Sequence, residues 1–172
     1  SMAAVNGQIR VAEETLARGQ PTLGLCLGMQ SMMTAAVRRS PGFESAIPAE
    51  VTPDEALHSF VPFADGRHRC GVFPFSSGLI PGHIREMHYN HRYCFNPELL
   101  PALSPGGVRV SAQSDGIVEA VSQPELPFWH GVQGHPELMS RPDAPHPLFV
   151  AFIRAAMEYK AAERLPLDPD SE

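Results

Sequence analysis

The stretch PTLGLCLGMQSM, residues 21–32, decides the fold of this chain. Its first part, TLGLC (22–26), is short and apolar, which is typical of a buried strand. Helical patterns lie on both sides of it. One covers residues 1–19 with Gly19 at its end, and the other runs from the cysteine to Arg38–Arg39. Helix, strand, tight turn and helix in this order predict an α/β fold with a mostly parallel central sheet.

The rest of the chain adds strands and two further helices. Residues 41–66 are interrupted by prolines, and we expect them to be mostly loop. Ser114–Asp115–Gly116 predicts a hairpin turn between two apolar segments. Asn96 and Pro97 are typical of a helix start, and the last helix is expected to begin near Pro147. The other expected strands span residues 66–75, 84–96, 107–113, 116–122 and 127–133.

The length of 172 residues suits one domain. We expect that domain to cover residues 1–165, followed by an acidic, proline-containing tail over residues 166–172 that frays. The chain opens inside a helical pattern, so we also expect that residues of the native domain precede Ser1.

Composition excludes several function classes. The formal net charge is −6 and there is no basic stripe, so nucleic acid is not an expected partner. No apolar run approaches the roughly 18 residues of a membrane span, and no signal-peptide pattern begins the chain. Three widely spaced cysteines, Cys26, Cys70 and Cys94, form neither a disulfide framework nor a CxxC metal motif. These features favour a reducing, cytoplasmic location.

Cys26 lies between two glycines at the predicted strand-to-helix junction. Such a sharp turn, a nucleophile elbow, holds the sulfur clear of the sheet on a strained backbone, and Gly24 and Gly28 would let the turn close. The sulfur would then lie at a helix N-terminus, which favours thiolate over thiol. The N–H of Leu27 would stabilise an oxyanion. Taken alone, the motif also allows a buried structural cysteine.

A thiol nucleophile needs a base and a group that orients the base. His135 in GVQGHPEL is the candidate base, and Glu137 lies two positions further on. Residues two apart in extended backbone point to the same side, and Pro136 restricts the chain between them. On its own, HPE is also compatible with a loop histidine and a solvated glutamate.

Metal and cofactor sites are not predicted. His88 and His91 would point to opposite faces of a strand, and no further ligand except Cys94 lies near them at ligand spacing. The chain contains no GxxxxGK[ST] motif, which excludes ATP binding by a P-loop.

The elbow and the HPE segment together resemble the class I glutamine amidotransferases, which use a catalytic triad. Within them the chain is most similar to the glutaminase domain of CTP synthase. The likeness covers residues 5–163. The stretches that carry it are PTLGLCLGMQ, HRYCFNPEL, GVRVSAQSDG followed by IVEAV, LPFWHGVQGHPEL and SRPDAPHPLFVAFIRAA. It implies a flavodoxin-like three-layer sandwich.

The resemblance also implies roles for individual residues. Cys26 would attack the side-chain amide of L-glutamine and form a γ-glutamyl thioester. His135 would act as base and then as acid, and Glu137 would orient it. Glu50 would hold the amino group of the substrate and Arg92 its carboxylate. The backbone that lines the glutamine pocket would be formed by Leu27, Gly28, Met29 and Gln30.

The chain departs from the family pattern at three points. Gly134 stands where the family usually has a bulky aromatic residue before the histidine. Asn90 replaces a basic residue, while Arg92 is retained. The strands and the second oxyanion donor that the family places upstream of the elbow are not in the sequence, nor is a synthetase domain.

The resemblance therefore implies hydrolysis of glutamine to glutamate and ammonia, without a cofactor, and delivery of the ammonia to a synthetase domain or subunit. Two alternatives stay open. The chain would be a homologue that binds a ligand or a protein without hydrolysing glutamine, or a γ-glutamyl hydrolase that acts on a conjugate through the same thioester.

Overall fold

The computed structural model describes residues 1–163, so the acidic tail predicted for residues 166–172 lies outside the described part. Three α-helices are present in that part: α1 (Met2–Arg18), α2 (Leu27–Arg38) and α3 (Pro147–Glu163). Two 3-10 segments, η1 (Pro97–Gly106) and η2 (Pro136–Met139), complete the helical structure.

A four-stranded sheet forms the centre of the fold. Its strand order is β1 (Thr22–Leu25), β8 (Trp129–Val132), β7 (Ile117–Ser122) and β6 (Arg109–Ser114). β1 and β8 are parallel, whereas β8, β7 and β6 are successively antiparallel, so the sheet is mixed. The predicted α/β fold is confirmed. The sheet is predicted to be mostly parallel, whereas within the described residues one strand pair, β1–β8, is parallel and two pairs are antiparallel.

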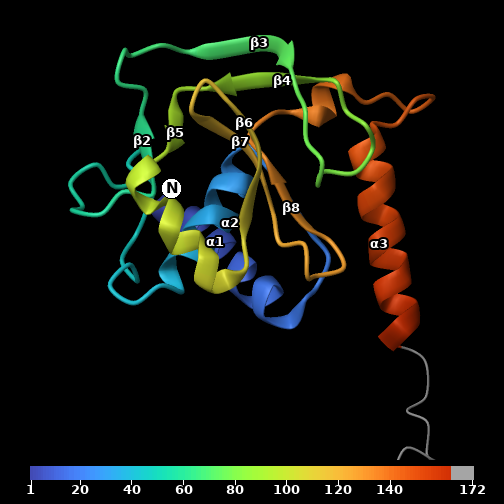
Figure 1. Ribbon diagram of the computed structural model, residues 1–172, viewed down its shortest axis with the longest axis horizontal. Helices are drawn as coiled ribbons and strands as arrows, with labels where there is room; N and C mark the ends of the chain where they lie inside the picture. The colour runs from blue at the N-terminus through green and yellow to red at the C-terminus, as the bar shows by residue number, and fades with distance from the viewer. Residues whose placement is uncertain (164–172) are drawn as a thin grey trace, which may run out of the picture.

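Two small antiparallel ribbons accompany this sheet. β2 (Phe60–Pro62) pairs with β5 (Tyr93–Phe95), and β3 (Arg69–Pro74) pairs with β4 (Glu86–His91). β4 and β5 are separated by the single residue Arg92, so the predicted strand over residues 84–96 is split in two. The β3–β4 ribbon lies above the sheet in Figure 1.

The sheet is covered on both faces. α1, α2 and η1 lie on one side of β8, and α3 lies on the other (Figure 1). The first side buries a cluster in which Ile9, Met33 and Leu99 meet Val121 and Trp129 of the sheet. On the second side, a separate cluster joins residues of β4 and α3 to Ala120 and Val132. This arrangement is the predicted three-layer sandwich.

The local signals in the sequence have the expected structural effects. α1 ends at Gly19, whose φ of 69° is left-handed and whose N–H bonds to the carbonyl of Thr15. Asp115 and Gly116 have φ angles of 50° and 75° between β6 and β7, as a two-residue hairpin turn requires. Asn96 caps η1 by accepting a hydrogen bond from the N–H of Glu98.

A pair of facing glycines lets α2 pack unusually close to the sheet. Gly24 of β1 and Gly131 of β8 are register partners. A Cβ atom at Gly131 would lie 2.8 Å from Cγ of Met29, and one at Gly24 would collide with Met32 and with the backbone of Gly28. The close approach fixes the start of α2 directly above the carboxyl ends of β1 and β8.

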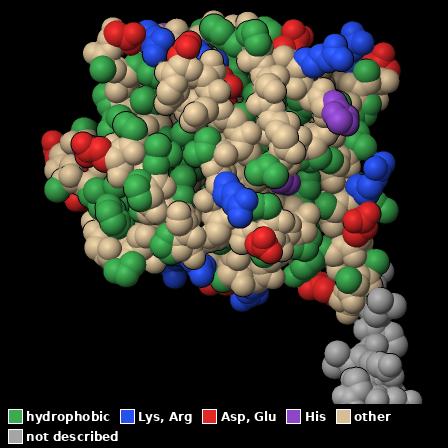
Figure 2. All heavy atoms as spheres, viewed as in Figure 1, with side chains coloured by type: hydrophobic (Ala, Val, Ile, Leu, Met, Phe, Trp, Pro, Cys, Tyr) green, Lys and Arg blue, Asp and Glu red, His purple; other side chains and the backbone are tan. Residues whose placement is uncertain are grey.

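The outer surface is mixed in character. On the face drawn in Figure 2, acidic and basic side chains are interspersed among uncharged ones. Within residues 1–163, no helix has the length and apolar composition to cross a membrane.

Candidate active site

Cys26 occupies the predicted elbow between β1 and α2. Its φ of 49° lies in the left-handed region, a strained conformation for a residue with a side chain. Its N–H donates to the carbonyl of Val132 (2.9 Å), and its own carbonyl accepts from the N–H of Gln30 (3.1 Å). The backbone of Cys26 is therefore tied to the end of β8 and to the first turn of α2 at once.

The two flanking glycines do not have the same role. Gly24 is needed for close packing, because its Cβ would lie 2.7 Å from the carbonyl carbon of Gly28. A Cβ at Gly28 would meet nothing within 4 Å. The expectation that both glycines are needed to close the turn is wrong for Gly28, which is already inside the regular helix α2.

The surroundings of the Cys26 thiol act in opposite directions. The Leu27 N–H and the side-chain amide of Gln133 (Nε2 to Sγ, 3.6 Å) donate to the sulfur and lower its pKa. Burial is the largest effect, and together with the carboxylates of Glu137 and Glu50 it raises the pKa above the usual value. The N–H at the helix N-terminus thus favours thiolate as expected, but desolvation outweighs the two donors, so the net shift of the Cys26 pKa in the free protein is upward.

His135 and Glu137 form the predicted pair. His135 lies three residues beyond the end of β8, and its Nδ1 is 2.5 Å from Oε1 of Glu137. The imidazole is partly buried, with 22% of its side chain exposed, whereas the glutamate side chain is 45% exposed. This contact leaves Nε2 as the ring nitrogen available for a reacting group.

Parallel pairing of β1 and β8 brings the nucleophile and the base to one edge of the sheet. Each residue follows the carboxyl end of its strand, and such ends meet at the same edge. Among the described residues, Gln133 is the side chain that hydrogen-bonds to Cys26 Sγ, and no hydrogen bond joins Sγ to His135. Catalytic hydrogen bonds are often long before substrate binds, so this geometry is compatible with a resting site.

Gly134 explains how the base is held from the other side. The N–H of His135 donates to the carbonyl of His88 in β4 at 2.7 Å. A Cβ at Gly134 would lie 2.8 Å from that same carbonyl oxygen and would collide with the side chain of Met87. β4 thus occupies the space that a side chain at position 134 would need, and it approaches the histidine directly.

A cavity of about 570 Å³ opens over Cys26. Four other predicted binding residues, Leu27, Gln30, Glu50 and Arg92, line it with Cys26. Within residues 1–163, neither Glu50 nor Arg92 forms an ion pair, so both charges are available to a ligand. The remaining lining residues are Ser1, Met2, Val5, Val51, His68, Asn90, His91 and Tyr93.

Two predicted binding residues lie apart from this cavity. The Met29 side chain is fully buried in the core, under the close contact with Gly131. Gly28 lines a different groove between α1 and β1. His135 and Glu137 are not among the lining residues of the cavity.

Gln133 is the site residue that the sequence analysis did not single out. It is completely buried, and its Oε1 accepts a hydrogen bond from Nε2 of Gln30 at 3.3 Å. The sequence feature that could have indicated it is its position two residues before His135, in the same GVQGHPEL segment. Its amide connects the helix residue Gln30 to the sulfur of Cys26.

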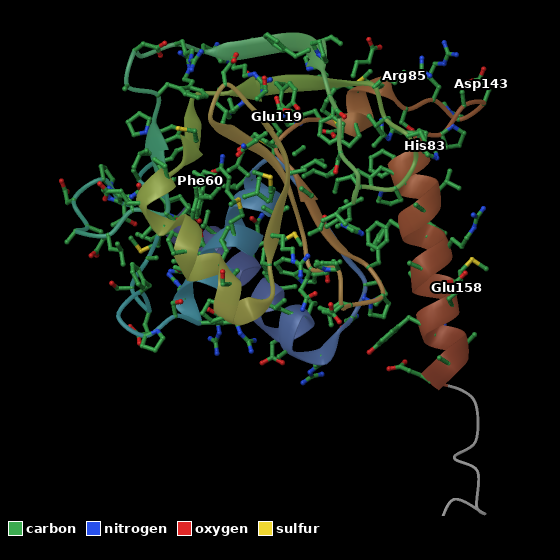
Figure 3. The ribbon with its side chains drawn as sticks, in the orientation of Figure 1. Phe60, His83, Arg85, Glu119, Asp143 and Glu158 are labelled. Carbon is green, nitrogen blue, oxygen red and sulfur yellow. The ribbon has the colours of Figure 1, made fainter. Side chains whose placement is uncertain are left out.

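A buried ion pair between Arg69 and Glu119 lies next to Gln133. Glu119 of β7 lies beneath the β3–β4 ribbon (Figure 3) and contacts the guanidinium of Arg69 in β3. The Arg69 guanidinium also stacks 3.8 Å from the ring centre of Tyr89 in β4. The carbonyl of Glu119 accepts from the N–H of Gln133 (2.8 Å). The β7 residue that forms the ion pair is therefore also hydrogen-bonded to the site residue Gln133.

No group of three or more His, Cys, Asp or Glu side chains within the described residues is arranged to hold a metal ion. His88 and His91, the two histidines considered as ligands, lie on β4 without a third partner of this kind.

The fold and the site together define a class of protein. A family model described as glutamine amidotransferase class-I matches residues 1–155, nine-tenths of the chain. The chain belongs to the class I glutamine amidotransferase family.

The individual relatives that the chain matches within this family include CTP synthases. The chain is 37% identical to the CTP synthase of Saccharopolyspora erythraea, over 95% of this chain and 33% of that protein. It is 38% identical to the CTP synthase of Mycobacterium leprae, over 95% of this chain and 32% of that protein. The chain thus spans about a third of the length of the curated relatives it matches.

A solved structure shows the same similarity in three dimensions. The glutaminase domain of Trypanosoma brucei CTP synthase, determined with bound acivicin, superposes with a TM-score of 0.77. The two sequences are 26% identical, and the match covers 90% of this chain and 66% of that one.

Proposed function

We propose that the chain hydrolyses L-glutamine to glutamate and ammonia through a thioester on Cys26. The observation that supports the proposal is that Cys26, on a strained elbow, and the His135–Glu137 pair follow the carboxyl ends of two adjacent parallel strands. The family membership supports the same chemistry.

The proposed reaction has two halves. Cys26 Sγ gives its proton to His135 and attacks the side-chain amide carbon of glutamine. The carbon–nitrogen bond then breaks, and the departing nitrogen takes the proton from His135 to leave as ammonia. Water, deprotonated by His135, attacks the thioester, releases glutamate and restores the thiol. Glu137 would stabilise the imidazolium in both halves.

Substrate recognition is proposed to rest on two opposite charges. Glu50 and Arg92 line the cavity over Cys26, and the amino group and carboxylate of free glutamine carry complementary charges. The ammonia would pass to a synthetase domain or subunit of the CTP synthase type, a proposal supported by the relatives. A cytoplasmic location stays a prediction.

A second candidate function is ligand binding without turnover. The raised pKa of Cys26 favours it, as does the absence of a Cys26–His135 hydrogen bond within the described residues. In that case glutamine would occupy the cavity and release no ammonia.

The test combines an ammonia-release assay with labelling by a glutamine-mimicking chloroketone, located by mass analysis of the peptide that contains Cys26. We expect labelling that free glutamine slows, together with ammonia release that Cys26→Ser abolishes. Cys70→Ser is the matched control, because Cys70 is exposed on β3 and away from the cavity.

The other outcomes identify the alternatives. Labelling that glutamine slows, without ammonia release even when a CTP synthase-type synthetase is present, identifies the binding module. Labelling that only γ-glutamyl conjugates slow identifies a γ-glutamyl hydrolase. Failure of the chloroketone to label Cys26 contradicts the proposal.

A further inference from the structure

The sulfur of Cys26 has a side-chain partner that the triad does not include. Gln133 is completely buried, and its Nε2 lies 3.6 Å from Sγ. Its Oε1 accepts from Gln30 at 3.3 Å, so one end of the amide is occupied and the other end faces the sulfur. A buried amide held at both ends has little freedom to turn.

The backbone around Gln133 is equally fixed. Gln133 directly follows β8, and its N–H donates to the carbonyl of Glu119 in the neighbouring strand β7. Gln30 belongs to the first turn of α2, where its N–H donates to the carbonyl of Cys26. The amide of Gln133 therefore spans the same two elements, β8 and α2, that form the elbow.

The electrostatic surroundings make this donor important. The carboxylates that act on the sulfur are Glu137 of η2 and Glu50 of the loop after α2, and both oppose thiolate formation, as does burial. Leu27 and Gln133 supply the two hydrogen bonds that oppose this effect. The other charged or titratable side chains of the cavity wall are His68, His91, Arg92 and Tyr93.

We propose that Gln133 holds the Cys26 sulfur in the free protein and stabilises its thiolate, with Gln30 fixing the direction of the Gln133 amide. This inference rests on the proposed role of Cys26 as nucleophile, but it concerns a residue outside the Cys–His–Glu triad. In the resting protein the sulfur is paired with this amide and not with His135.

The test measures the rate of Cys26 alkylation by iodoacetamide as a function of pH. Trypsin cleaves after Arg18, Arg38, Arg69, Arg85, Arg92 and Arg109, so the three cysteines fall in separate peptides. Cys70 and Cys94 therefore report in the same sample whether an effect is confined to Cys26. Iodoacetamide needs no glutamine turnover, so failure of this inference is distinguishable from failure of the proposed function.

We expect Gln133→Leu to raise the apparent pKa of Cys26 by about one unit, because a hydrogen bond to a charged group is lost. Below the pKa, alkylation then slows about tenfold. Gln133→Glu should slow it further, since a carboxylate accepts but cannot donate. Gln30→Leu, which leaves Gln133 in place but removes its orienting partner, should give a smaller shift in the same direction.

Gln123→Leu is the matched control. Gln123 is also a buried glutamine, but its Oε1 accepts from the N–H of Glu125, and it lies outside the cavity. A purely structural role for Gln133 would change melting temperature in both variants without changing the pH profile of Cys26. A folded Gln133→Leu protein with an unchanged or lowered pKa of Cys26 overturns the proposal. If that variant does not fold, an unchanged profile in the isosteric Gln133→Glu protein overturns it.

Discussion

Cys26 and His135 follow neighbouring parallel strands, yet they are held by different parts of the molecule. The nucleophile half is supported by the close approach of α2 to the sheet at Gly24 and Gly131, which includes contact of Gly24 with the backbone of Gly28. The base half is supported by β4, through the carbonyl of His88 and the side chain of Met87, and its glutamate is half exposed. The nucleophile half is part of the core, whereas the base half is a turn nearer the surface that the β3–β4 ribbon holds in place.

This difference predicts which positions of the site tolerate substitution. Contacts with backbone cannot be relieved without moving an element, whereas contacts with the far part of a side chain can be relieved by a second substitution. Three substitutions, ordered by their expected effect on the free energy of unfolding, test the contrast.

Gly24→Ala should have the largest effect. The new Cβ would collide with Met32 and would lie 2.7–2.8 Å from the carbonyl carbon and oxygen of Gly28, so α2 must move off the sheet. We expect a loss of about 3 kcal/mol or more, at the upper end of overpacking effects. Urea unfolding measures it, and Gly28→Ala, whose Cβ meets nothing within 4 Å, is the control.

The same measurement in a Met32→Ala background tests the cause. Because the backbone contacts remain, Gly24→Ala should be nearly as destabilising there as in the natural sequence. A large rescue would show that the nucleophile half, too, is limited by side-chain packing.

Gly134→Ala should have an intermediate effect, about 1–3 kcal/mol. The collision here is chiefly with the Met87 side chain, with a further contact of 2.8 Å to the carbonyl oxygen of His88. In a double-mutant cycle, Gly134→Ala should therefore be clearly less destabilising when Met87 is already alanine. Additive free energies would contradict the assignment of Met87 as the group that fills this space.

Glu137→Ala should have the smallest effect on stability, below about 1 kcal/mol, because exposed ion pairs contribute little. If His135 is the base, Glu137→Ala should nevertheless lower kcat for glutamine hydrolysis. The residual kcat should be on the order of a hundredfold higher than that of Cys26→Ser, because the orienting member of a triad is the least costly to lose. If the loss in kcat, converted to a free energy, is no larger than the loss in free energy of unfolding, the pair is structural. Glu44→Ala, an exposed carboxylate in a loop, is the control.

Much of this fold was predictable because its signals are local. The ends of α1, the Asp115–Gly116 hairpin and the cap at Asn96 depend on the backbone preferences of single residues, and these act in the same way in any chain. The elbow at Cys26 was predictable for the same reason. Gly28 was misjudged because a glycine in the sequence does not reveal whether any atom faces it.

The sequence by itself determined the order of strand, elbow and helix, and the spacing of His135 and Glu137. Only the tertiary structure decided that Gln133 reaches the sulfur, that β4 fills the space beside Gly134, and that the pKa of Cys26 is raised. These three features depend on desolvation and on contacts between residues far apart in the chain. No local pattern encodes them, because the atoms meet only once β1, β8 and β4 are packed together.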